Sequence, residues 1–289
     1  MIWHEWCMCL FATLFRMWSP RLVPGYAPDG TPILSVLGKR TYAFEAGGVA
    51  RVDLENPIPF FEADLYHGKG DPTTEAPKQE LELVDWKPLV DVVVHGLAQP
   101  PLGNLGNHFD VVVEMAGIRG AVRVFGNRRV DYSRGSVRFS DPEPFASMPL
   151  HWGLAYGGVD RWSHPEVPLA FPPNPVGKGF AVDPPPHALH GLELPNLENV
   201  QKLLTPETFL VKKFERWNAA PLPAALGWMP RNGFPRIAMG TSPTVRSPEA
   251  DKFRHRISRN MPQAFLGAPD PAPLRPRNHL QNNGAPPFL

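Results

Sequence analysis

Histidine and aspartate are the residue types of this sequence best suited to acid–base or metal chemistry. His67 follows Asp64 by three positions and could act as a general base beside that carboxylate. His187 and His190 form an H-x-x-H pair, but the prolines of PPPHALHG predict a loop, not a helix that would place both rings on one face. The sequence has no G-x-S-x-G motif, and neither cysteine lies in a catalytic context. An enzyme, either a hydrolase using Asp64 and His67 or a metal-dependent enzyme using His187 and His190, stays open as the alternative function.

The stretch NPVGKGF, residues 174–180, raises the question of phosphate binding. A P-loop has a strand before it, a helix after it and a Ser or Thr directly after its lysine, and this stretch has none of these features. We therefore expect a rigid turn in which Asn174 bonds its own backbone, Pro175 fixes φ and Phe180 holds the end. A sharper hypothesis is that the backbone N–H groups between the glycines, together with Lys178, form a nest for a partner's carboxylate.

Large aromatic side chains occur where regular structure is sparse. Trp152 and Tyr156 precede the double glycine Gly157-Gly158, and further aromatic residues follow at Trp217, Trp228 and Phe234. One interpretation is that these side chains pack the loops onto a sheet. The other is an exposed aromatic groove for a partner, because Trp and Tyr dominate binding hot spots.

Strands in the first half of the chain must position these residues. A hairpin is predicted in which residues 33–44 turn at Gly47-Gly48 into residues 49–52, since glycine supplies the positive φ of a tight turn. Further strands are predicted at residues 89–97, 109–115, 118–125 and 137–139. Alternation in residues 120–125 has the period of two expected when one sheet face is buried. The prediction is a mainly β fold, an antiparallel sandwich or barrel.

Proline is frequent from Pro142 to Pro195, and proline cannot donate to a central ladder. Long, ordered, Pro/Gly-rich loops with a few short helices are therefore expected. One helix is predicted to begin at Asn196 as its cap, because apolar residues follow at helical spacing, and another at Thr205-Pro206-Glu207.

Composition limits the function. The 289 residues carry a net charge of +1, so no overall field attracts nucleic acid or an anionic membrane. Only 20% of residues are charged and 37 are proline, which is typical of a folded, loop-rich protein when 43% are hydrophobic. Cys7 and Cys9 cannot complete a zinc site and indicate a reducing, cytoplasmic location.

Three regions are expected. Residues 1–19 form an N-terminal extension, either a packed helix or an over-extended start, whose ten-residue apolar run at 6–15 is too short to span a bilayer. Residues 20–240 form a single β-rich domain, and residues 241–289 form a proline-rich tail over the surface or partly disordered.

An ordered series of short blocks resembles the domain of unknown function 2169 family, over roughly residues 20–240. The blocks are ADLYHG at 63–68, VDVVVHG at 90–96, RVFGNR at 123–128, PF with MPL at 144–150, AYGG at 155–158, NPVGKGF at 174–180 and LPNLE at 194–198. The family usually has Phe-Gly-Gly where this chain has Tyr156-Gly157-Gly158. Members occur in bacterial type VI secretion loci and act as adaptors or chaperones for secreted effectors.

The resemblance implies a non-catalytic, cytoplasmic adaptor without cofactor or metal. Its partners would be a secreted effector protein and spike or spike-tip proteins, with no nucleic acid and no membrane. A structural subunit of the secretion particle is a further hypothesis. The residues expected at the partner-binding surface are Trp152, Tyr156, Gly157, Gly158, Asn174, Pro175, Gly177, Lys178, Gly179, Phe180 and Asn196.

Overall fold

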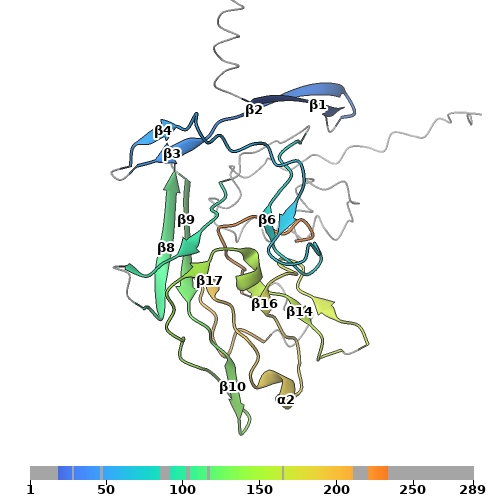
Figure 1. The fold of residues 1–289 in the computed structure, drawn as a ribbon. Coiled ribbons are helices and arrows are strands. Elements are labelled where there is room, and N and C mark those ends of the chain that lie inside the picture. Colours follow the sequence, from blue (N-terminus) through green and yellow to red (C-terminus); the bar gives the residue numbers. More distant parts are fainter. Residues whose placement is uncertain are drawn as a thin grey trace, which may run out of the picture.

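The computed structural model describes residues 19–27, 29–45, 48–84, 92–101, 105–115, 118–164, 166–210 and 221–233. These residues form a mainly β protein in which small sheets are joined by long loops (Figure 1). Within them, one sheet has three strands, the other sheets have two, and no closed barrel forms. The predicted mainly β class is therefore confirmed, with many small sheets in place of a continuous one.

The three-stranded sheet has the order β17-β9-β8. Strands β8 (His108–Met115) and β9 (Ile118–Phe125) form the long antiparallel hairpin of Figure 1, in register Val111↔Val122. Along β8 the odd-numbered positions from Phe109 to Val113 are less exposed than the even-numbered ones, which is the alternation of a sheet with one buried face. Both predicted strands are confirmed.

Strand β17 (Leu197–Asn199) corrects the prediction of a helix after Asn196. It pairs with β9 through Leu197↔Val124, and all three of its residues are buried. The free edge of β9 offers backbone partners and apolar contacts to a short segment, and these outweigh the helical spacing of the apolar residues from Leu197 to Leu204. The second helix, predicted at Thr205-Pro206-Glu207, is also not formed. The structure has a single turn there, closed by the Phe209 N–H donating to the Thr205 carbonyl over 3.0 Å.

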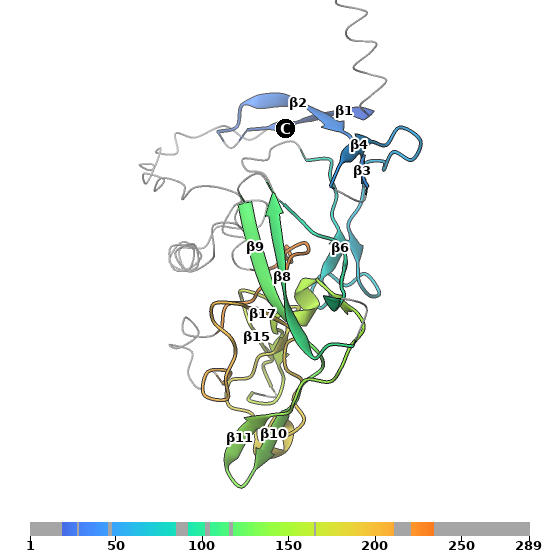
Figure 2. The same cartoon turned by 90° about the vertical axis from the view of Figure 1, so that its left-hand side faces the viewer.

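Two hairpins lie at one end of the molecule, beyond the end of the β8–β9 hairpin (Figures 1 and 2). The first joins β1 (Ser19–Tyr26) to β2 (Pro32–Lys39), and the second joins β3 (Tyr42–Phe44) to β4 (Ala50–Val52). The predicted return of the chain into residues 49–52 is confirmed for β3 and β4. Residues 33–39, however, pair with the preceding strand β1, a partner that was not predicted.

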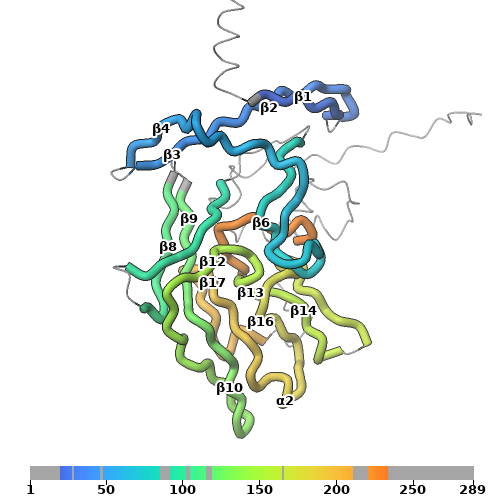
Figure 3. The backbone as a smooth tube through the Cα atoms, in the orientation of Figure 1, coloured from blue at the N-terminus to red at the C-terminus, as the bar shows by residue number. Residues whose placement is uncertain are grey.

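The remaining elements are short, and Figure 3 shows how the chain winds between them. They are β5 (Leu65–Tyr66), β6 (Pro77–Gln79), β7 (Leu97–Ala98), β10 (Val130–Ser133), β11 (Ser136–Phe139), β12 (Met148–Pro149), η2 (Trp152–Leu154), β13 (Tyr156–Gly157), β14 (Val159–Asp160), β15 (Leu169–Ala170), β16 (Lys178–Gly179) and α2 (Pro186–Leu189). Strand β11 confirms the strand predicted at 137–139. Of the strand predicted at 89–97, residues 89–91 lie outside the described residues, and only Leu97 is in a strand.

Two groups of buried apolar residues form the interior. The first, here called the sheet core, packs Val122, Val124 and Leu197 of the central sheet against Trp152 and Leu226. The second, here called the aromatic core, consists mainly of Tyr156, Phe171, Phe180 and Phe209 with Leu194. The proline-rich loops are therefore ordered by side chains that fill these two groups.

Candidate functional site

The loop at residues 174–180 is bound directly to the segment that contains Trp152 and Tyr156. The Asn174 side-chain amide donates to the carbonyl oxygens of Trp152 and Tyr156, each over 3.0 Å. The Asn174 carbonyl accepts from the Gly158 N–H over 2.8 Å, and its side chain is fully buried. The expectation that Asn174 would bond its own backbone is wrong, because its amide joins two segments far apart in sequence.

Parallel pairing of β13 with β16 brings these two segments into close contact. Gly157 has φ +146° and Gly158 has φ +98°, conformations that side chains resist. A Cβ on Gly157 would lie 2.1 Å from the Asn174 carbonyl oxygen, and one on Gly158 would lie 2.4 Å from the Gly177 carbonyl oxygen. Both glycines are required by the close approach of two backbones.

The backbone N–H groups of this loop are already used inside the protein. Gly177 donates to Asn174, Lys178 to Ala155 and Phe180 to Gly157, in each case to the carbonyl oxygen. A nest for a partner's carboxylate therefore cannot use these three N–H groups. The Lys178 ammonium lies 3.8 Å from a Glu193 carboxylate oxygen, and burial lowers the pKa of Lys178 while Glu193 opposes that shift.

The two aromatic residues before the double glycine are part of the interior. The Trp152 indole N–H donates to the Gly227 carbonyl over 2.9 Å, and the Tyr156 hydroxyl donates to the Phe209 carbonyl over 2.8 Å. The Tyr156 ring also packs edge-on against Phe171, with centroids 5.3 Å apart. For these two residues the interpretation of loop packing is confirmed. Trp217 and Phe234 lie outside the described residues.

The structure brings the predicted partner-binding residues together, but mostly in the interior. Gly177 and Lys178 are partly exposed, whereas the buried members of the set are Trp152, Tyr156, Gly157, Gly158, Asn174, Pro175, Gly179, Phe180 and Asn196. A partner could touch little of this set. Its members fix the shape of the loops around them, which is a supporting role for any surface that binds a partner.

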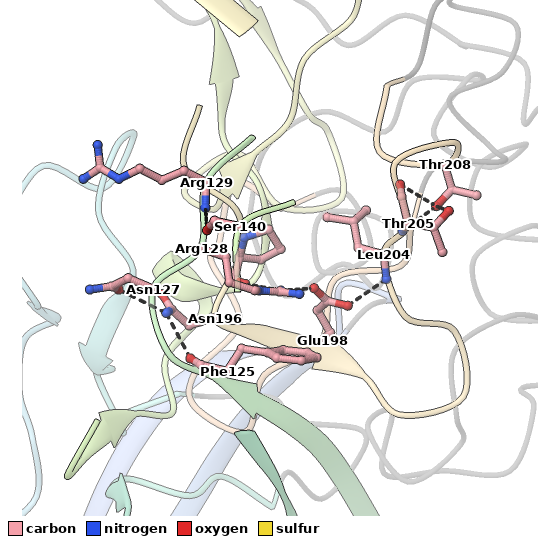
Figure 4. A network of polar contacts seen from close by, with 11 residues as sticks. Phe125, Asn127, Arg128, Arg129, Ser140, Asn196, Glu198, Leu204, Thr205 and Thr208 are labelled. Atoms are coloured by element: carbon pink, nitrogen blue, oxygen red, sulfur yellow. Dashed lines mark hydrogen bonds and ion pairs between the residues drawn. The ribbon is translucent and has the colours of Figure 1, made fainter. Parts of the chain in front are cut away.

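A buried polar network, which the sequence did not reveal, surrounds Asn196 (Figure 4). The Asn196 amide donates to the Phe125 carbonyl over 3.1 Å, so it does not cap a helix. Arg128 lies over the Phe125 ring, 3.7 Å from its centroid, forms an ion pair with Glu198 and donates to the Pro195 carbonyl. These contacts join the end of β9 to β17 by charge-assisted hydrogen bonds.

Asp160 organises a second turn by accepting four hydrogen bonds. Its donors are the N–H groups of Trp162, Ser163 and Val182 and the Ser163 hydroxyl. Burial, the largest single effect on this carboxyl, raises its pKa, but the hydrogen bonds together hold the pKa below its ordinary value. Asp160 is therefore charged in the folded protein at neutral pH and stabilises the turn.

Asp64 and His67, the residues of the enzyme alternative, have different partners. The Asp64 carboxylate accepts from the Arg231 guanidinium over 2.8 Å and from the Leu81 N–H over 2.7 Å. The His67 ring instead stacks on His151, with centroids 4.1 Å apart. Asp64 thus connects two distant parts of the chain, and the geometry does not pair it with His67 as an orienting carboxylate.

Three histidines from separate segments form a surface cluster, here called the histidine cluster: His67, His95 and His151. Burial, followed by the charge of Lys78, lowers the pKa of both His67 and His95. Burial, followed by the neighbouring His67, lowers the pKa of His151 to about 4, and its Nδ1 accepts the Gly153 N–H over 3.1 Å. These rings are therefore uncharged near neutral pH.

His187 and His190 lie on either side of the end of α2, which corrects the prediction that both are in a loop. The His187 ring meets Trp162 edge-on at 6.2 Å, whereas the His190 Nδ1 accepts the Tyr132 N–H over 3.3 Å. The two rings therefore have separate partners. Among the described residues, no group of three or more His, Cys, Asp or Glu side chains is arranged to hold a metal ion.

The exposed apolar surface lies mainly in the first part of the described chain. Nine of the fifteen exposed large hydrophobic residues of the described structure come before residue 60: Leu22, Tyr26, Leu34, Val36, Tyr42, Phe44, Val49, Leu54 and Ile58. Most belong to the two N-terminal hairpins. This surface was not predicted from the sequence, because residues 32–39 carry apolar side chains on both sides of the strand and only the structure shows which side is open.

Comparisons with known proteins place the chain in a family. A family model described as "Uncharacterized protein conserved in bacteria (DUF2169)" matches residues 29–265. A search of curated proteins and a search of solved structures each found no match. The described part of the chain holds no helix with the length and hydrophobicity needed to cross a membrane. Because the family model covers most of the sequence, the chain belongs to the domain of unknown function 2169 (DUF2169) family.

Proposed function

We propose that this protein is a non-catalytic, cytoplasmic adaptor that binds a type VI secretion effector and helps load it onto the secretion spike. The role is the one implied by the family resemblance. The observation that carries the proposal is the exposed apolar surface of the two N-terminal hairpins, where seven large hydrophobic side chains face solvent: Leu22, Tyr26, Leu34, Val36, Tyr42, Phe44 and Val49. Contiguous exposed apolar surface marks interaction sites in proteins that are otherwise well packed.

The interior supports this role by holding the loops in one conformation. Asn174 and the buried Arg128–Glu198 pair join segments that are distant in the sequence. A rigid scaffold loses little conformational freedom when a partner binds, so more of the contact energy appears as affinity. An adaptor must also release its client, and a moderate interface of standard size suits both requirements.

The test is a secretion experiment in the bacterium that encodes the protein. Deletion of the gene is expected to remove one effector from the culture supernatant while the tube protein of the apparatus is still secreted. Purification of the tagged protein in complex with that same effector would further support the adaptor role. Loss of tube-protein secretion as well would instead identify a structural subunit of the particle. Unchanged secretion of every effector would refute the adaptor role.

Complementation of the deletion with surface variants locates the function on the molecule. Val36→Lys places a charge on the apolar hairpin surface, and Val167→Lys places the same charge at a similarly exposed valine outside the hairpins. The Val167→Lys gene is expected to restore effector secretion and the Val36→Lys gene is not. Equal restoration by both genes would show that the hairpins do not bind the effector.

A further inference from the structure

We propose that one face of the β1–β2 hairpin is the docking site for an amphipathic α-helix of the partner protein. This inference deepens the proposed function, on which it rests for the identity of the partner as an effector.

The register of the hairpin produces a largely apolar face. Leu22 pairs with Val36, Pro24 with Leu34 and Tyr26 with Pro32, so three consecutive cross-strand pairs share one side of the sheet. The four larger side chains are between 61% and 70% exposed, and both prolines are exposed as well. No charged side chain belongs to these three pairs. We call these six residues the hairpin face.

The opposite side of the hairpin is held by the rest of the molecule. The side chains of β2 that point to that side, from Ile33 to Lys39, are less exposed than those of the hairpin face. The Lys39 ammonium donates to Glu82 over 2.6 Å and to the Pro59 carbonyl over 2.8 Å, and it lies 4.7 Å from the centroid of the Phe61 ring. The hairpin face is therefore presented outward in a fixed orientation, at the end of the molecule seen in Figures 1 and 2.

Geometry selects a helix over an added strand. A strand that paired with an edge of the hairpin would extend the hydrogen-bond ladder but would leave the hairpin face in water. A segment that lies across the face removes it from water. Residues on one side of a strand are about 6.8 Å apart, so the three pairs span about 14 Å. A helix places apolar side chains at i, i+4 and i+8 about 6 Å apart, which matches that spacing.

The size of the face favours a single helix over a second copy of this chain. A length of about 14 Å and a width of two strands, about 10 Å, give an area of roughly 140 Å². A stable interface between two folded proteins buries about 800 Å² on each partner. Two copies packed through this face would bury far less than that. A helix with one apolar stripe fits the face fully, and the absence of charge in the three pairs calls for an uncharged stripe.

The experiment uses the full-length protein and two synthetic, fluorescein-labelled peptides. The first has leucines at i, i+4, i+7 and i+11, with glutamate and lysine at the other positions. The second has the same composition with the leucines at alternate positions, the pattern of a strand. Fluorescence anisotropy measures binding of each. The helical peptide is expected to bind the wild type, to gain helical circular dichroism on binding, and to bind more tightly than the alternating peptide.

Variants establish where the helical peptide binds. Leu34→Lys and Val36→Lys are expected to weaken binding about tenfold or more, because each places a charge under the helix without a partner. Val167→Lys is the matched control and is expected to bind like the wild type. Since all three positions are exposed, unchanged melting temperatures are expected to show that the fold is intact.

Three results would overturn the inference. They are equal binding of both peptides, equal binding by all variants, and a concentration-dependent dimer in light scattering that Val36→Lys abolishes, which would assign the face to a second copy. The secretion experiment separates this inference from the adaptor role. If effector secretion depends on the protein but the helical peptide does not bind, the adaptor role stands and the helix site fails. If the peptide binds but effector secretion does not depend on the protein, the helix site stands and the adaptor role fails.

Discussion

The side chains of Arg128 and Glu198 form an ion pair in which only 7% and 3% of their respective surfaces are exposed. The pair makes further contacts, because Arg128 also donates to the Pro195 carbonyl and Glu198 accepts from the Leu204 N–H. It therefore ties the residues after β9 to β17 and to the turn that follows. A buried pair of this kind is costly to break on one side only.

Replacing one member of this pair should strongly destabilise the protein. Arg128→Met leaves the Glu198 carboxylate buried without its cation, and the free energy of unfolding is expected to fall by about 3–5 kcal/mol. Arg129→Met is the control, because its pair with Glu193 is more than half exposed and is worth about 0–1 kcal/mol. Urea unfolding measures both. Similar losses in the two variants would contradict the role assigned to Arg128.

The contact of Asn174 with the 152–156 segment gives a second prediction. Asn174→Ala removes the side-chain donor to the Trp152 and Tyr156 carbonyls, although the Trp152 carbonyl still accepts the Ala155 N–H. Loss of these two buried hydrogen bonds is expected to cost about 1–3 kcal/mol. Asn56→Ala, at an exposed position, is expected to change stability by less than about 0.5 kcal/mol. Thermal unfolding compares the two variants. A small effect of Asn174→Ala would mean that the loop is held by its backbone pairing alone.

Alanine substitutions at two glycines with positive φ distinguish the cost of backbone strain from the cost of steric overlap. Gly135→Ala meets open space at φ +79°, so it is expected to cost only about 1–2 kcal/mol of strain. Gly157→Ala adds an overlap with the Asn174 carbonyl oxygen at 2.1 Å and is expected to cost clearly more, or to prevent folding. Chemical denaturation and the yield of folded protein measure the difference. Equal costs would disprove the close approach of β13 and β16.

Acid should destabilise the protein through the histidine cluster. The pKa of His151 is lowered from 6.5 to about 4 on folding, so the unfolded chain takes up a proton in this range that the folded protein does not. The stabilising contribution is therefore complete above pH 6.5 and is lost as the pH falls toward 4. His67 and His95, whose pKa values are also lowered, act in the same direction.

His151→Asn tests this dependence without removing the local hydrogen bond. Asparagine is a preferred cap residue and can accept the Gly153 N–H that His151 accepts now. The melting temperature of this variant is expected to fall less than that of the wild type between pH 6.5 and 4. The control is the exposed His164→Asn, which should follow the wild type. An identical decline in His151→Asn and wild type would remove His151 from the explanation.

Periodic apolar residues made part of the fold predictable. Strands β8, β9 and β11 and the turn from β3 into β4 follow from alternation and from glycine, both of which are local properties. The same reasoning failed after Asn196, where apolar residues at helical spacing predicted a helix but residues 197–199 form a strand because the edge of β9 is available. For the partner-binding residues it could not foresee burial, since glycine, aromatic and asparagine residues give the same sequence pattern in an exposed loop and in a buried one.

The sequence by itself determined the mainly β class, the proline-rich ordered loops and the family of this protein. Only the tertiary structure decided which loops meet, as in the contact of Asp64 with Arg231, which are 167 positions apart. It also decided that NPVGKGF is mostly interior and that the hairpin face is open. The physical reason is that local patterns fix the backbone conformation and the side of a strand that is apolar, whereas burial depends on which distant segment covers that side.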